Sequence, residues 1–151
     1  MASIVITPAG GASITVPGTV LMDTVSGLPV TPSSSAVRAV TALTIANAAS
    51  VSDVLDLDRT ALLGFIAPAA WTAAALNIEV STDNSTWASA VLGSSNAAVG
   101  SWSAVVASNA YSVDMVALLP FRYVRLRSGT FAVPVAQGAA RVFNVVTRPL
   151  A

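Results

Sequence analysis

The sequence predicts an all-β protein, a jelly-roll-like β-sandwich of about eight strands preceded by an extended N-terminal arm. Helical periodicity is weak throughout, and short β-prone runs are instead separated by Gly, Pro, Asn, Asp and Ser. Residues 76–81 and 121–127 alternate between apolar and polar side chains, as strands with one buried face do. The apolar residues are mostly Ala and Val, and small and β-branched side chains fit pleated sheets well.

We divide the chain into an arm with its linker, residues 1–35, and a sandwich domain, residues 36–151. The arm contains β-prone pieces at Ser3–Thr7 and Ser13–Val16, and the glycine pair between them permits a small hairpin. It ends in TPSSS, a composition typical of linkers. We expect the arm to order on contact with a partner, by adding a strand to a neighbour's sheet edge.

The sandwich domain begins with two apolar, β-prone runs, Val40–Ile45 and Ala61–Ile66, with a polar stretch between them. Ala75–Ser81 is the clearest predicted strand, because its apolar and polar residues alternate. Ser81–Ser85 (STDNS) predicts a turn, since these side chains bond their own backbone. Trp87–Val91 then returns the chain as the next strand.

The second half of the domain starts with residues 93–110, which are rich in Gly, Ser and Ala and predict a long loop. One short strand is expected within it, near Trp102–Val106. Later strands are predicted at Tyr111–Met115, Phe121–Arg127 and Ala140–Thr147, and a connection containing Gly and Pro separates the last two.

Alternation also predicts which side chains face the core. Val124 and Leu126 are expected on the core face of their strand, and Phe143 and Val145 on that of the last strand. Glu79 alternates to the other side of its strand, where we expect a solvated face.

The composition is unusual for a protein surrounded by water. Hydrophobic residues make up 54% of the chain and charged residues 9%, with a formal net charge of zero and a mean hydropathy of +0.74. An ordinary soluble domain has about 25% charged residues, and few charges without a net charge favour association. A membrane span at Ala61–Ile78 is the alternative, but Pro68 interrupts it and no Lys or Arg cluster flanks it. We therefore expect no membrane association and an outside largely covered by other protein.

Catalytic chemistry is hard to assemble from these residues, because the chain has no Cys, His or Lys. A Ser nucleophile lacks its usual general base, and a zinc site would need carboxylates only. A carboxylate pair using Glu79 stays formally open. Asp53, Asp56 and Asp58 lack the Gly and the oxygen spacing of a calcium loop, which favours turn and capping roles. The sequence predicts that the protein is not an enzyme and holds no cofactor or metal.

Five of the seven arginines follow residue 120. We expect Arg122, Arg125 and Arg127 to pair with carboxylates or to lie at a subunit contact, where Arg is favoured for bidentate pairing. Nucleic-acid binding is not expected, because the chain has no positive excess. The partner-binding residues predicted from the arm and from this run are Ile4, Ile6, Ile14, Val16, Arg122, Arg125 and Arg127.

Two segments carry a resemblance. LNIEVSTDNSTW (76–87) and RYVRLR (122–127) are similar to strands of discoidin or galactose-binding jelly rolls. The longer set LLGFIAPAAWTAAALNIEVSTDNSTW, FRYVRLRSGT and RVFNVVTRPL resembles small virion proteins of tailed bacteriophages, over roughly residues 60 to 150. That family often has Gly where Asn84 stands here, and Asn tolerates the same left-handed backbone.

The resemblance implies a structural virion protein of a tailed bacteriophage, specifically a capsid decoration (cement) protein. Such a protein is made in the host cytoplasm and binds the outside of the major capsid protein shell, in multiple copies or as a homo-oligomer. The alternatives are a carbohydrate-binding module of a head or tail fibre and a tail or baseplate component. A carbohydrate module predicts exposed Trp71, Trp87 or Trp102 beside polar groups, whereas decoration predicts that these rings pack or face coat protein.

Overall fold

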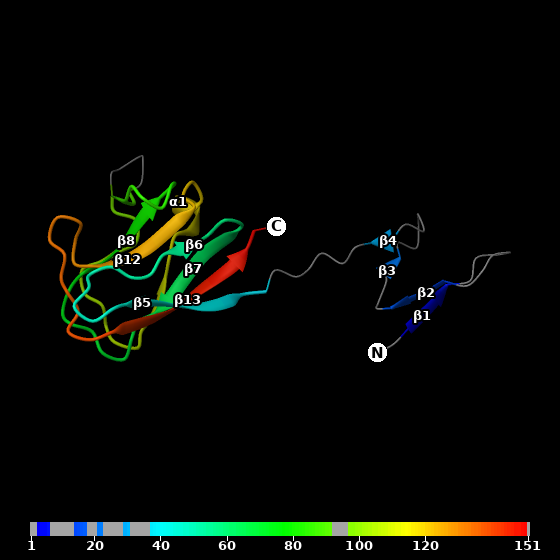
Figure 1. Ribbon diagram of the computed structural model, residues 1–151, viewed down its shortest axis with the longest axis horizontal. Coiled ribbons are helices and arrows are strands. Elements are labelled where there is room, and N and C mark those ends of the chain that lie inside the picture. The colour runs from blue at the N-terminus through cyan, green and yellow to red at the C-terminus, as the bar shows by residue number, and fades with distance from the viewer. Residues whose placement is uncertain are drawn as a thin grey trace. The chain divides into compact units, whose positions relative to one another are not determined.

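The computed structural model describes residues 37–91 and 97–150, and the backbone of four short strands between residues 3 and 30. The chain divides into two units, Met1–Ser35 and Ala36–Ala151. In the first, β1 (Ser3–Ile6) pairs antiparallel with β2 (Ile14–Pro17), and β3 (Leu21–Met22) pairs with β4 (Pro29–Val30) (Figure 1). The hairpin predicted around the glycine pair is therefore confirmed.

The register of this hairpin sets Ile4 opposite Val16 and Ile6 opposite Ile14. These are the four partner-binding residues predicted in the arm, and their side chains lie outside the described residues. Their role in binding a partner stays a prediction.

The second unit is the predicted all-β sandwich, built from two antiparallel sheets (Figure 1). The strand order of the four-stranded sheet is β11 (Ala110–Ser112), β7 (Thr60–Ile66), β13 (Arg141–Pro149) and β5 (Ala39–Ile45). The order of the five-stranded sheet is β10 (Ser101–Trp102), β8 (Leu76–Ser81), β12 (Tyr123–Ser128) and β6 (Leu55–Asp56), with β9 (Ala88–Ser89) also on β8.

The core lies between the two sheets and contains the side chains that alternation predicts. Val124, Leu126, Phe143 and Val145 are all fully buried. The Phe143 ring centroid lies 5.7 Å from that of Phe65 in an edge-to-face arrangement, which aromatic pairs favour. The predicted core faces of β12 and β13 are confirmed.

The segment after β11 differs from the prediction, because the expected strand Tyr111–Met115 ends at Ser112 and a short helix, α1 (Met115–Leu118), follows. The Asp114 carboxylate accepts a hydrogen bond from the Val116 N–H and thereby caps the helix, while Leu118 is buried. This local cap and one buried anchor outweigh the β propensity of the segment.

Residues 61–78, considered above as a membrane span, form β7, a loop and the start of β8. Within residues 37–91 and 97–150, no helix is long and apolar enough to cross a membrane.

The predicted turn after β8 is held by one carboxylate. Asp83 Oδ1 accepts hydrogen bonds from the backbone N–H groups of Ser85 (2.9 Å) and Thr86 (2.8 Å) and from the Ser81 hydroxyl. Asn84 lies in the left-handed region with φ of 60°, which explains why Asn can stand there. The backbone donors lower the pKa of Asp83 well below its usual range.

This turn should make stability depend on pH. Because the folded-state pKa of Asp83 is depressed, its contribution is fully present above the unfolded pKa of about 3.9 and is lost as the pH falls further. We expect Asp83→Asn to lower the urea midpoint at about pH 7, with a gap from wild type that narrows below about pH 4. Urea titrations across this range test the effect, and a gap that stays constant down to about pH 2 would contradict it.

Candidate docking surface

The four-stranded sheet has a face that points away from the core, called here the outward face. Register and alternation place its residues: Val40, Ala42, Thr44, Gly64, Ile66, Ala110, Ser112, Val142, Asn144 and Val146. These ten positions are uncharged, and two exposed arginines, Arg38 and Arg148, continue the same alternation at the ends of β5 and β13. Three large aliphatic side chains are well exposed there, Val40 (67%), Ile66 (43%) and Val142 (45%).

Small residues make this face concave near β11. A depression of about 540 Å³ lies over Gly64, Ala110 and Ser112, with Ile66 and Val146 among its other lining residues. A Cβ at Gly64 would collide with the Tyr111 carbonyl oxygen, so this glycine lets β11 approach β7 closely. Its lining is mostly apolar and small, and one charged residue, Arg38, lies at its rim.

An antiparallel sheet with one face in water normally carries polar residues on that face. Here β5 and β13 present aliphatic side chains on both faces, because Leu43 and Val145 are buried while Val40 and Val142 are exposed. An exposed face with this many aliphatic side chains is typical of a surface that another protein covers.

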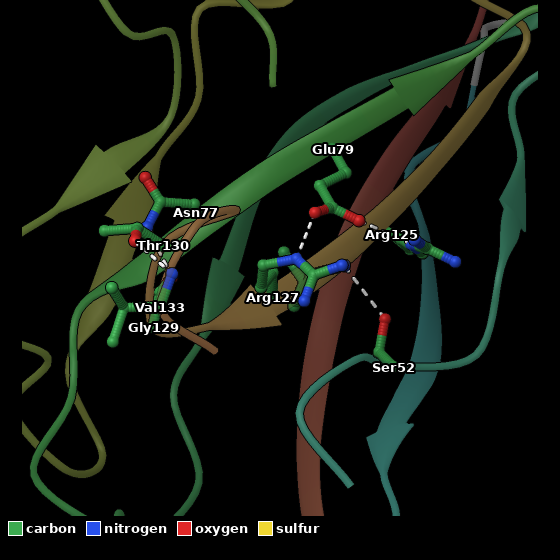
Figure 2. Close-up of polar contacts among 9 residues, drawn as sticks. Ser52, Asn77, Glu79, Arg125, Arg127, Gly129, Thr130 and Val133 are labelled. Atoms are coloured by element: carbon green, nitrogen blue, oxygen red, sulfur yellow. Dashed lines mark hydrogen bonds and ion pairs between the residues drawn. The ribbon is translucent and has the colours of Figure 1, made fainter. Parts of the chain in front are cut away.

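The outer side of the five-stranded sheet is organised differently, around Glu79 (Figure 2). Its carboxylate accepts hydrogen bonds from Arg125 Nε at 2.7 Å and from Arg127 Nε, and the Glu79 side chain is 0% exposed. The solvated position predicted for Glu79 is therefore wrong. Glu79 does point away from the core, but the two arginines of β12 cover it, because Arg125 lies directly opposite it in the register.

The two arginines are themselves packed on aromatic rings. The Arg125 guanidinium carbon lies 4.1 Å from the centroid of Trp87, and that of Arg127 lies 5.3 Å from the centroid of Phe131. Such cation–π contacts hold the guanidinium planes in place. Both arginines pair with a carboxylate of the same chain, which confirms the predicted carboxylate pairing of Arg125 and Arg127.

Arg122 pairs with Asp56 at 2.8 Å, and both side chains are about half exposed. The hydrogen bond from the Arg122 guanidinium lowers the pKa of Asp56 and raises that of Arg122. Asp56 accepts from the Asp58 N–H two residues later, which confirms the predicted turn role for Asp56. Asp53 instead accepts from the Thr44 N–H of β5, nine residues away. Among the described residues, no group of His, Cys, Asp or Glu is arranged to hold a metal ion.

The three tryptophans are all partly buried. Trp71 packs edge-to-face on Phe143 and donates its indole N–H to the Ala74 carbonyl, and Trp102 packs edge-to-face on Phe65. Trp87 has Arg125 over its ring. The rings thus stabilise the fold instead of standing free beside polar groups.

Comparison with known proteins gave no match to any family model, curated protein or solved structure.

The alternation pattern of the sequence does not predict the outward face. Its signal is the run FNVVT, in which adjacent residues are apolar although one face of β13 is exposed. Such a run is also typical of a strand buried on both faces, so the pattern alone does not locate the surface.

Proposed function

We propose that this chain is a structural virion protein of a tailed bacteriophage, a capsid decoration protein that binds the outside of the major capsid shell. The observation that carries the proposal is the outward face of the four-stranded sheet, which has exposed aliphatic side chains and charged residues only at its margin. A protein that works by docking needs such a face, and it needs no catalytic group.

Energetics favour a docked state for this face. Complete burial of a fully exposed aliphatic side chain contributes about 1.5–3 kcal/mol, and Val40, Ile66 and Val142, which are 43–67% exposed, would each contribute part of this. The coat shell is the proposed occupant because the chain resembles virion proteins and because its surface carries few charges to keep copies apart. By linking neighbouring coat subunits, many docked copies resist the outward pressure of packaged DNA.

The carbohydrate-binding alternative receives less support. Sugar sites commonly use an aromatic ring with one open face beside polar groups, whereas Trp71 and Trp102 pack on core rings and Trp87 lies against Arg125.

The direct test is electron microscopy of phage particles with and without the gene for this chain. Decoration predicts heads of normal size that lack an outer density and release DNA at a lower temperature. Density that disappears only from the tail would assign the protein there instead and contradict the proposal.

A matched pair of variants tests the docking face. Val142→Lys places a charge on the outward face, and Val116→Lys makes the same change on α1, where the valine is also exposed (65%). We expect Val142→Lys to weaken binding to undecorated heads by about tenfold or more, since burying an unpaired ammonium is costly. Val116→Lys should bind as wild type does. Equal binding by both variants, measured by co-sedimentation with heads, would exclude the outward face as the docking surface.

A further inference from the structure

We propose that two copies of this chain associate through β5, pairing antiparallel about a two-fold axis at Thr41. β5 is the last strand of its sheet, next to β13 (Figure 1). All seven of its residues, AVTALTI, are uncharged. Edge strands usually carry charges, proline or a covering loop that prevents pairing with another chain.

The first part of this edge is unprotected. The four consecutive residues Ala39 to Ala42 are exposed, although Ala39 and Thr41 belong to the side of the strand that faces inward at Leu43. The described residues of the sandwich domain therefore leave this part of β5 open on both faces and along its edge, a combination that a partner strand would satisfy.

The backbone of the free edge has its hydrogen-bonding groups aimed outward. The Asp53 N–H donates to the Thr44 carbonyl, and the Thr44 N–H donates to the Asp53 carboxylate, so both backbone groups of Thr44 point away from β13. Because this direction alternates along an antiparallel strand, the groups of Ala42 and Val40 also point away from β13. Within the described part of the chain, no residue pairs with them.

These limits fix the register of the pair. Asp53 closes the edge at Thr44, and β5 begins at Ala39, so the free stretch runs from Ala39 to Leu43 with Thr41 at its centre. Pairing about that centre sets Val40 of each copy opposite Ala42 of the other. Each of these two pairs exchanges backbone hydrogen bonds. The same strand thus serves as both partners, which a two-fold interface requires.

Charge complementarity supports the same register. Pairing about Thr41 sets Arg38, which precedes β5, opposite Thr44 of the second copy, where Asp53 closes the edge. In the single chain the Arg38 side chain lines the depression on the outward face, and it would turn toward that carboxylate in the pair. Both residues are exposed, and the two-fold axis repeats the contact. The two four-stranded sheets then join into one, and their outward faces become continuous.

The purified full-length chain tests the pairing without phage particles, so the result is independent of the proposed virion function. Five residues a side form a small interface, and we expect an association that grows with concentration. In sedimentation, the apparent mass should rise from that of one chain, 15.2 kDa, toward that of two. Val40→Pro removes an outward N–H without affecting the ladder to β13 and should abolish the rise, whereas Val40→Thr should keep it. A wild-type mass that stays monomeric up to the solubility limit would overturn the proposal.

A cysteine cross-link tests the register, because the chain has no Cys of its own. Thr41 would lie opposite Thr41 of the second copy in a non-hydrogen-bonded pair. Their Cα atoms would be about 4.5 Å apart, a distance that a disulfide can bridge. Ala39 would face Leu43, leaving the two copies of residue 39 too far apart to bridge. Under mild oxidation, Thr41→Cys should give about tenfold more disulfide-linked dimer than Ala39→Cys. Equal yields, or more dimer from Ala39→Cys, would contradict the pairing about Thr41.

Discussion

Replacing Glu79 with Gln should lower the free energy of unfolding by about 3–5 kcal/mol, because it leaves two largely buried guanidinium groups without a countercharge. Gln has the size of Glu and keeps one oxygen acceptor, but its NH₂ group is a donor facing donors. The arginine side chains are only 19% and 13% exposed, so water replaces the lost partner poorly. Chemical denaturation followed by Trp fluorescence measures the loss.

The matched control is Asp56→Asn, which makes the same chemical change in the ion pair with Arg122. Since both of these side chains are about half exposed, we expect the denaturation midpoint to stay nearly unchanged. If Glu79→Gln proved as mild as Asp56→Asn, the buried cluster would not stabilise the five-stranded sheet.

Replacing Phe143 with Ala should cost about 3–5 kcal/mol of stability, because a fully buried ring is lost and a cavity is left. The ring packs edge-to-face on Phe65 of β7 and on Trp71 in the following loop, so the cavity opens at the centre of the core. Thermal or urea unfolding of the variant measures the effect.

Phe131→Ala is the control for this change, since the Phe131 ring is 54% exposed and contacts the Arg127 guanidinium. We expect a loss of about 1 kcal/mol or less, in line with an exposed cation–π contact. A Phe131→Ala variant as unstable as Phe143→Ala would mean that burial does not determine the stability of this sandwich.

Composition predicted that the protein has a docking surface, but not which residues form it. The low charge content predicted that other protein covers a large part of the outside, which stays a prediction, and it did not indicate that Val40, Ile66 and Val142 would be exposed on one face. Their common face could not be predicted, because they come from three strands far apart in the chain whose neighbours are set by the order of the sheet.

The arginine cluster of β12 was also predicted only in part. The sequence indicated carboxylate partners for Arg125 and Arg127, yet it placed Glu79 in solvent, because alternation reports which side of a strand a residue takes and nothing about what lies over it. The register between β8 and β12 put these residues together.

By itself, the sequence determined the all-β class, most strand positions, the turn at Asp83 and the core faces of β12 and β13. Each of these depends on a pattern or a side-chain hydrogen bond within a few residues, where local physical chemistry decides the outcome. Only the tertiary structure decided that Glu79 is buried, that β5 is the last strand of its sheet, and that Val40, Ile66 and Val142 are exposed on one face of that sheet. These properties arise from contacts between segments distant in the chain, whose pairing depends on how all strands pack together and on no short run of residues.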